Sequence, residues 1–246
     1  MGLSRLLNLT FSVRFGSHDT IPVHPTVALC MDVRYHAQCA DMKTYPSIPR
    51  WGLKSTDYLY IFDKLDGSNV RCEIDRKGKV RKFGRRDGLL DDSNPFLLEV
   101  PDLIQEKYAE FLIPIVQKQG WEFATFYFEF WGANSFAGSH QVEPHTVTLF
   151  DVAPHKKGFL EPHVFLELFG HLDTAKLLLH APFTSEVAAQ VTNSTLEGMT
   201  FEGVVCKGYL SRKTGMPHML KWKSQAWLDR LKQVCKGDEA KFNLLQ

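Results

Sequence analysis

Seven short apolar runs rich in β-branched and aromatic residues are distributed along this chain. In several runs apolar and polar residues alternate, as they do in a strand with one buried face. Runs of this kind, separated by turns and by a few helical segments, predict an antiparallel-rich α+β fold. The runs span residues 58–62, 70–74, 80–83, 124–130, 146–152, 203–207 and 218–222.

Helical patterns interrupt the strands at a few places. Asp102 is in position to cap the first helix, and Pro114 is expected to kink it or to shorten its end. Pro162 suits the first turn of a second, short helix. A third helix is expected after Thr184 and a last one after Ser224.

Length and composition favour a globular protein that can build one sizeable core, with 246 residues, 44% hydrophobic and 23% charged. No apolar stretch reaches the length of a membrane span and no secretory signal is recognisable, so we expect a cytoplasmic (intracellular) protein without membrane contact. Five cysteines at irregular spacings, with no Cys-x-x-Cys pair, predict reduced thiols.

The positive charge of this chain is unevenly distributed. The net charge is only +1, which argues against nucleic-acid binding through bulk charge. The segment Arg76–Arg86 is nevertheless strongly basic, and a phosphate backbone could lie there. The alternative is a solvated hairpin whose lysines protect a sheet edge.

The hexapeptide Lys64–Asn69 places a lysine beside a carboxylate and a glycine, just after an apolar run. A free lysine has a pKa near 10.4, so a lysine that attacks phosphorus needs a pKa lowered by about three units. Burial, a nearby cation or a metal could supply the roughly 4 kcal/mol involved. Gly67 would let the backbone approach a bulky ligand. The alternative is an exposed lysine beside an Asp-Gly hairpin turn.

A lone carboxylate, Glu129, lies inside the aromatic run 126–131. Burying its charge costs several kcal/mol unless a partner or ligand satisfies it. Alternation places Tyr127, Glu129 and Trp131 on one face. Glu129 therefore either belongs to a binding site or faces solvent on a half-exposed sheet.

Three further segments each allow a functional and a structural interpretation. Phe150 could stack on a flat ring or belong to the core. Glu202, directly before a glycine and an apolar strand, could hold magnesium or occupy a turn. Lys221 and Lys223 share one face of a strand, where they could bind a phosphate or form a solvated edge.

In order, the chain offers a strand-terminal lysine, an arginine some twenty residues on, a strand glutamate, a stacking aromatic, Glu-Gly-Val-Val and Lys-x-Lys. This series resembles the nucleotidyltransferase motifs of the covalent ligases and capping enzymes. Ser68-Asn69 after the lysine motif resembles the RNA ligases, in particular the bacteriophage RNA ligase 2 type and the trypanosome editing ligases. The segments Tyr45–Pro49 and Arg86–Gly88 look like that group too, and the resemblance spans about Tyr45 to Lys223.

The resemblance implies an ATP-grasp-like nucleotidyltransferase domain with two packed sheets and flanking helices. Residues 1–246 would form this single domain, because the residues after Lys223 suffice for a terminal helix but not for the additional C-terminal domain of most relatives. RNA binding would then depend on the basic segment, the N-terminal region or a partner protein. RNA ends, at nicks in duplex RNA or in single strands, would be the substrate.

The implied activity is ATP-dependent RNA ligation in three transfers at phosphorus. Lys64 would attack the α-phosphate of ATP, AMP would pass to an RNA 5′-phosphate, and a 3′-hydroxyl would displace AMP. Lys221 and Lys223 would grip the α-phosphate and depress the pKa of Lys64, and Arg86 would act on the RNA end. Arg85 is a competitor for the role of Arg86, because a one-residue difference in the hairpin would exchange their faces.

Binding roles follow from the same resemblance. Adenine would lie against Phe150, Glu129 would accept hydrogen bonds from the ribose, and Asn69 would help to hold the RNA end. Magnesium, or manganese, would be held by Glu202, with Asp66 holding metal-bound water. The nucleotide-binding set is Asp63, Lys64, Asn69, Arg86, Glu129, Phe150, Glu202, Lys221 and Lys223.

Three other functions compete with this hypothesis. Ser68-Asn69 disfavours a DNA ligase and a GTP-dependent mRNA capping enzyme. A non-catalytic nucleotide- or RNA-binding relative is disfavoured because Lys64, Glu202 and Lys221 are all present.

Overall fold

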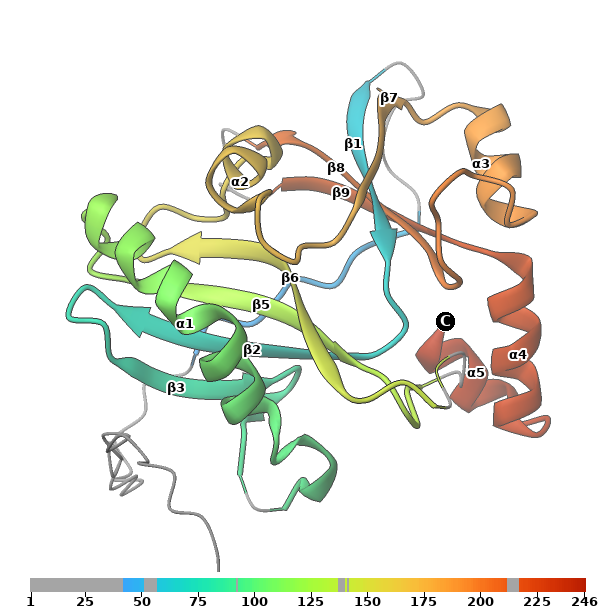
Figure 1. Cartoon of the computed structure of the whole chain (residues 1–246). Helices are drawn as coiled ribbons and strands as arrows, with labels where there is room; N and C mark the ends of the chain where they lie inside the picture. Colours follow the sequence, from blue (N-terminus) through green and yellow to red (C-terminus); the bar gives the residue numbers. More distant parts are fainter. Residues whose placement is uncertain (1–41, 51–56, 92, 137–139, 141, 212–216) are drawn as a thin grey trace, which may run out of the picture. The chain divides into compact units, whose positions relative to one another are not determined.

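The computed structural model describes residues 42–50, 57–91, 93–136, 140, 142–211 and 217–246. Residues 39–246 form one compact unit, and the prediction of a single domain over residues 1–246 stays a prediction. The described part is an α+β structure with two antiparallel sheets and flanking helices, as predicted (Figure 1). Within these ranges, no helix is both long and apolar enough to cross a membrane.

One sheet has four strands in the order β7-β1-β8-β9, and all neighbours are antiparallel. The strand β7 was not predicted, because its sequence Leu-Leu-Leu-His-Ala-Pro does not alternate. A proline is tolerated there because β7 is at the edge of the sheet. The strands are β1 (Tyr58–Lys64), β7 (Leu177–Pro182), β8 (Gly203–Leu210) and β9 (Pro217–Lys223).

The other sheet has five antiparallel strands in the order β4-β3-β2-β5-β6. Its long strands β2, β5 and β6 correspond to predicted runs, whereas the two-residue β4 was not predicted. The strands are β2 (Ser68–Asp75), β3 (Val80–Arg85), β4 (Gly88–Leu89), β5 (Phe123–Trp131) and β6 (Thr146–Pro154).

The hexapeptide Lys64–Asn69 connects the two sheets. The strand β1 ends at Lys64 in the four-stranded sheet, and β2 begins at Ser68 in the five-stranded sheet. The two strands do not pair with each other, so the interpretation as an Asp-Gly hairpin is wrong. A loop that joins two sheets places its residues where the sheets meet.

The long helix α1 (Val100–Lys118) covers one face of the five-stranded sheet (Figure 1). Its apolar stripe packs on Val70, Cys72 and other buried residues of β2, β5 and β6. Because side chains alternate along a strand, the residues between them, such as Asn69 and Arg71, face the other way. That second face carries the functional site.

The shorter helices flank the four-stranded sheet and the end of the chain. Thr184 caps α3 and Ser224 caps α4, as predicted. The prediction that Asp102 caps α1 is wrong: the helix begins at Val100 and continues past Pro114 to Lys118. The remaining elements are η1 (Pro95–Leu97), α2 (Pro162–Phe169), α3 (Ser185–Thr192), α4 (Gln225–Cys235) and α5 (Glu239–Leu245).

Candidate active site

A cavity of about 430 Å³ is lined by residues of both sheets. The structure brings the candidate residues of the sequence analysis together, since all of them line this one cavity. They are Asp63, Lys64, Asp66, Asn69, Arg85, Arg86, Glu129, Phe150, Glu202, Lys221 and Lys223.

Lys64, Glu202 and Lys223 form an ion-paired cluster at the end of the four-stranded sheet. The strand register places Lys64 beside Gly203 and Gly203 beside Lys223. Glu202 lies just before β8, and its two carboxylate oxygens accept from Lys64 Nζ at 2.8 Å and from Lys223 Nζ at 2.7 Å. Gly203 has a φ of 138°, and a Cβ there would overlap the carbonyl oxygen of Trp222. Glycine is therefore required for Glu202 to reach both lysines.

The protonation of Lys64 differs from the prediction. Burial lowers the pKa of Lys64, but Glu202, Glu129 and Asp66 together raise it above its ordinary value. The expected lowering of this pKa is therefore wrong for the protein without ATP. The neighbouring lysine behaves differently: burial, only partly opposed by Glu202, lowers the pKa of Lys223 to about 8. Burial, with Lys64 and Arg50 nearby, also lowers the pKa of Lys221.

Asp66 is held by a residue that the sequence did not single out. Its carboxylate accepts a hydrogen bond from the indole Nε1 of Trp227 at 3.0 Å, and both side chains are buried. The ammonium of Lys223 lies 3.5 Å from the centre of the same indole ring. Trp227 of α4 thus joins Asp66 to the ion-paired cluster.

Asp63 lines the cavity, and its carboxylate is also bound by the protein backbone. It is buried, and its carboxylate accepts a hydrogen bond from the backbone N–H of Thr200 at 2.9 Å. Burial raises the pKa of Asp63, and that bond partly offsets the effect. The geometry gives Asp63 a positioning role for the segment that leads into Glu202.

Gly67 lies directly against the five-stranded sheet. A Cβ at this position would overlap the carbonyl oxygen of Phe130 on β5. The glycine therefore lets the loop after Lys64 pass directly against this sheet. Gly67 also lines the cavity, and its expected close approach to a ligand stays a prediction.

Asn69 and Glu129 are direct cross-strand neighbours on β2 and β5. The side-chain oxygen of Asn69 is buried and has no hydrogen-bond partner in the described part of the chain. Burial raises the pKa of Glu129 to about 8, opposed by Lys64 and reinforced by Glu202 and Asp66. The unpartnered oxygen of Asn69 and the carboxyl of Glu129, whose pKa is raised, thus line the cavity side by side, where a ligand could bind to them.

Phe150 owes its orientation to an irregularity in the sheet. Tyr127 pairs with Asp151 and Phe128 with Leu149, so Phe150 is the extra residue of a β-bulge. Bulges turn a side chain out of the regular alternation, and Phe150 accordingly lines the cavity while its neighbours are buried.

A buried polar cluster lies behind Phe150 and was not predicted. Lys207 Nζ donates to the carbonyl oxygen of Phe150 at 2.7 Å and pairs with Asp151 at 2.9 Å. The hydroxyl of Tyr45 also donates to Asp151, at 2.9 Å, and the Tyr45 ring packs edge-on against Phe150. The signal available in the sequence was a lysine inside the apolar strand Gly203–Leu210.

Both candidate arginines line the cavity, so the choice between them stays open. Arg85 ends β3 opposite Val70, and Arg86 lies in the two-residue turn between β3 and β4. Strand alternation does not extend into this turn, so it does not assign Arg86 to a face of the sheet. Arg71, which the sequence analysis missed, is buried and donates to the carbonyl oxygen of Arg86 at 3.3 Å. It fixes the backbone that carries Arg86.

No ready-made metal centre exists among the described residues: no three His, Cys, Asp or Glu side chains gather there. Glu202 is the carboxylate with the best access to the cavity cluster, since Asp66 is bound to Trp227 and Asp63 to Thr200. One or two carboxylates are sufficient for magnesium when substrate phosphates complete the coordination. The residues present therefore fit a metal that binds together with a nucleotide.

Comparison of sequences identified no relative: neither a protein-family model nor a curated protein matches the chain. Comparison of structures found a similar fold. The Naegleria gruberi RNA ligase with PPi has a TM-score of 0.54 and 16% sequence identity, over 72% of this chain and 52% of that one. A mutant of the same ligase with AMP and Mn has a TM-score of 0.51 and 15% identity, again over 72% and 52%.

A further mutant of the ligase, with ATP and Mn, has a TM-score of 0.54 and 15% identity. The chain spans about half the length of these solved structures. At this level of identity the likeness concerns the arrangement of helices and strands. The chain therefore has the two-sheet nucleotidyltransferase fold found in these RNA ligases.

Proposed function

We propose that this protein is an ATP-dependent RNA ligase that works through a lysyl-AMP intermediate. The observation that carries the proposal is Lys64, which lines a cavity shared with Glu202, two further lysines and Phe150. A mostly buried lysine among phosphate-binding groups has the chemistry of a nucleophile for an α-phosphate. The fold shared with an RNA ligase supports the same reaction class.

ATP would lie across the cavity between the two sheets. The adenine would contact Phe150, and the ribose hydroxyls would donate to Glu129 or to the unpartnered oxygen of Asn69. Lys221 and Lys223 would bind the α-phosphate. The two ammonium groups repel each other, and an anion between them would attract both. Lys64 Nζ would form a bond to the α-phosphorus while the bond to pyrophosphate breaks.

Lys64 must lose a proton before this attack. In the ion-paired cluster its ammonium is stabilised by Glu202, so the neutral amine is scarce. Magnesium or manganese, when bound, would neutralise phosphate charge and engage the carboxylate of Glu202. Without the Glu202 interaction, burial and the neighbouring Lys221 and Lys223 favour the neutral amine of Lys64. Glu202 would thus keep Lys64 protonated until substrate arrives.

The later steps would use the arginine side of the cavity. An RNA 5′-phosphate would attack the lysyl-AMP phosphorus and release Lys64, and a 3′-hydroxyl would then displace AMP. Arg86, held by Arg71 through its backbone, would bind the RNA phosphate. The RNA ligase 2 type is supported by Ser68-Asn69, which begins β2 at the cavity.

Incubation with α-labelled ATP and magnesium, followed by denaturing electrophoresis, tests the proposal. We expect acid-labile label on the wild-type protein and on Lys118→Ala, which removes an exposed lysine outside the cavity, but none on Lys64→Ala. Label on Lys64→Ala would refute the nucleophile, and label from GTP but not ATP would favour a capping enzyme. Sealing of RNA with a preformed 5′-adenylate tests the last step alone.

A further inference from the structure

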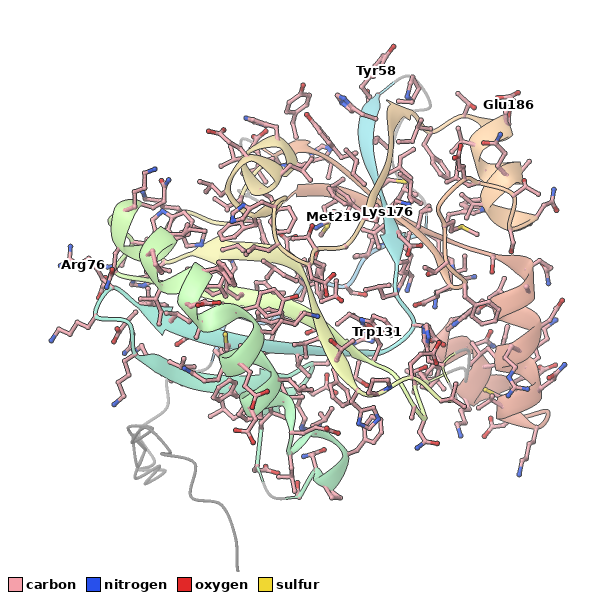
Figure 2. All side chains as sticks on the ribbon, viewed as in Figure 1. Tyr58, Arg76, Trp131, Lys176, Glu186 and Met219 are labelled. Carbon is pink, nitrogen blue, oxygen red and sulfur yellow. The ribbon has the colours of Figure 1, made fainter. Side chains whose placement is uncertain are left out.

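Six exposed cations gather at the end of the five-stranded sheet that is remote from α4 and α5. Figure 2 shows Arg76 at the outer tip of the β2–β3 hairpin, with α4 and α5 at the opposite end of the protein. Within the described ranges, none of the six has a carboxylate within salt-bridge distance. We name this set the basic sheet end; it consists of Arg76, Lys77, Lys79, Arg81, Lys156 and Lys157.

A stack of three side chains ties the two parts of the basic sheet end together. The Arg81 guanidinium lies 5.0 Å from the centre of the Phe123 ring, and His155 stacks on Phe123 at 4.1 Å. His155 directly precedes Lys156 and Lys157 in the turn after β6. A guanidinium already held against a ring loses less rotamer freedom when it binds an anion.

The basic sheet end shares the sheet face that forms the cavity. Asn69 and Asp75 lie on the same side of β2, and their partners on β5 are Glu129 and Phe123. Six residues of strand separate the two positions, which corresponds to about 20 Å. Midway along this face, exposed Lys43 lies 4.3 Å from the centre of the Phe159 ring.

The carboxylates near the hairpin are bound by groups other than its cationic side chains. The carboxylate of Asp75 accepts hydrogen bonds from the backbone N–H groups of Lys77 and Lys79, so it stabilises the turn and leaves both lysine side chains in solvent. Of the neighbouring carboxylates, Glu122 is occupied by His155 at 3.1 Å. The positive potential of several neighbouring cations favours a ligand with several negative charges, such as a nucleic-acid backbone, over a single small anion.

We propose that the RNA strand extending 3′ from the reactive 5′-phosphate runs along this face and that the basic sheet end binds its phosphates. The inference rests on the proposed ligase function and adds the path of the substrate. With about 3.4 Å per stacked nucleotide, 20 Å corresponds to roughly six nucleotides. Contacts to phosphates carry no base information, so binding here is independent of sequence.

The test uses Lys77→Gln with Lys79→Gln, and as matched control Lys232→Gln with Lys236→Asn on the far end of the protein. Asparagine is chosen because Lys236 has a φ of 50°, which asparagine tolerates. Binding of 5′-phosphorylated RNA is followed by fluorescence anisotropy between 50 and 200 mM salt. RNA of four and of twelve nucleotides is compared, as single strands and at a nick in a duplex.

We expect the hairpin variant to bind twelve-nucleotide RNA about tenfold more weakly at low salt. The slope of log affinity against log salt should fall by about 1.4 for single strands or 1.8 for duplex. Four-nucleotide RNA and the control variant should show neither change. Unchanged binding of the long RNA, or equal weakening of the short one, would overturn the inference.

ATP labelling separates this inference from the proposed function. The hairpin variant keeps the cavity intact, so it should form lysyl-AMP as the wild-type protein does. If the wild-type protein takes no label, the ligase function fails. If both proteins take label but bind long RNA equally, only the RNA path fails.

Discussion

Replacing Glu129 with glutamine is expected to stabilise the protein while weakening its binding of ATP. The carboxyl lines the cavity, and burial raises its pKa to about 8. Its ordinary value, and therefore that of the unfolded chain, is near 4.5. Between about pH 4.5 and 8 the folded state holds a proton that the unfolded state has released, so stability falls as pH rises through this window.

The magnitude follows from the size of that window. A shift of about 3.5 pH units corresponds to at most about 5 kcal/mol, lost at about 1.4 kcal/mol per unit. Glu129 is only partly buried, and solvent screening reduces this value. Glutamine has the same shape and no charge, so Glu129→Gln should gain about 2 kcal/mol at pH 8 and little near pH 4.5.

Denaturant unfolding at several pH values between 4.5 and 8.5 measures this difference. Glu167→Gln, at an exposed position of α2, is the matched control and should differ little from the wild-type protein at any pH. A Glu129→Gln variant that gains no stability at pH 8, or that gains as much at pH 4.5, would refute the reasoning. Its ATP labelling should require more ATP, because an amide replaces the carboxyl proposed as an acceptor for the ribose hydroxyls.

Two further substitutions probe the walls of the cavity. Trp227→Phe keeps a ring beside Lys223 but removes the indole N–H that donates to the buried carboxylate of Asp66, so the free energy of unfolding should fall by about 2 kcal/mol. A double-mutant cycle with Asp66→Asn measures the coupling energy between the two residues. If the effects of the two substitutions on stability simply add, the contact is contradicted. Phe150→Leu should weaken ATP binding about 2- to 10-fold through the loss of ring stacking, whereas Phe150→Trp should retain it; equal labelling at limiting ATP for all three proteins would place adenine elsewhere.

Most of the fold was predictable because strand alternation and helix caps act locally. The runs around β1, β2, β5 and β6 could be found from single segments, and so could the caps Thr184 and Ser224. The missed strands β4 and β7 lack such signals, whereas the missed helix α5 has one, the cap Asp238, that the sequence analysis overlooked. The strand β7 depends on pairing with β1, more than one hundred residues earlier, and no local pattern reveals that partner.

The cavity residues were predictable one by one, but their protonation was not. The pKa of Lys64 depends on a balance between burial, which lowers it, and three carboxylates from different segments, which raise it. Sequence order gave Lys221 and Lys223 as the nearby charges and therefore the wrong direction. The deciding contact is the 2.8 Å pair with Glu202, which exists only because β1 and β8 are neighbours and Gly203 admits the turn. Under the proposed function, the same pair would make Lys64 dependent on its substrate, since its amine would become reactive only when Glu202 binds another group.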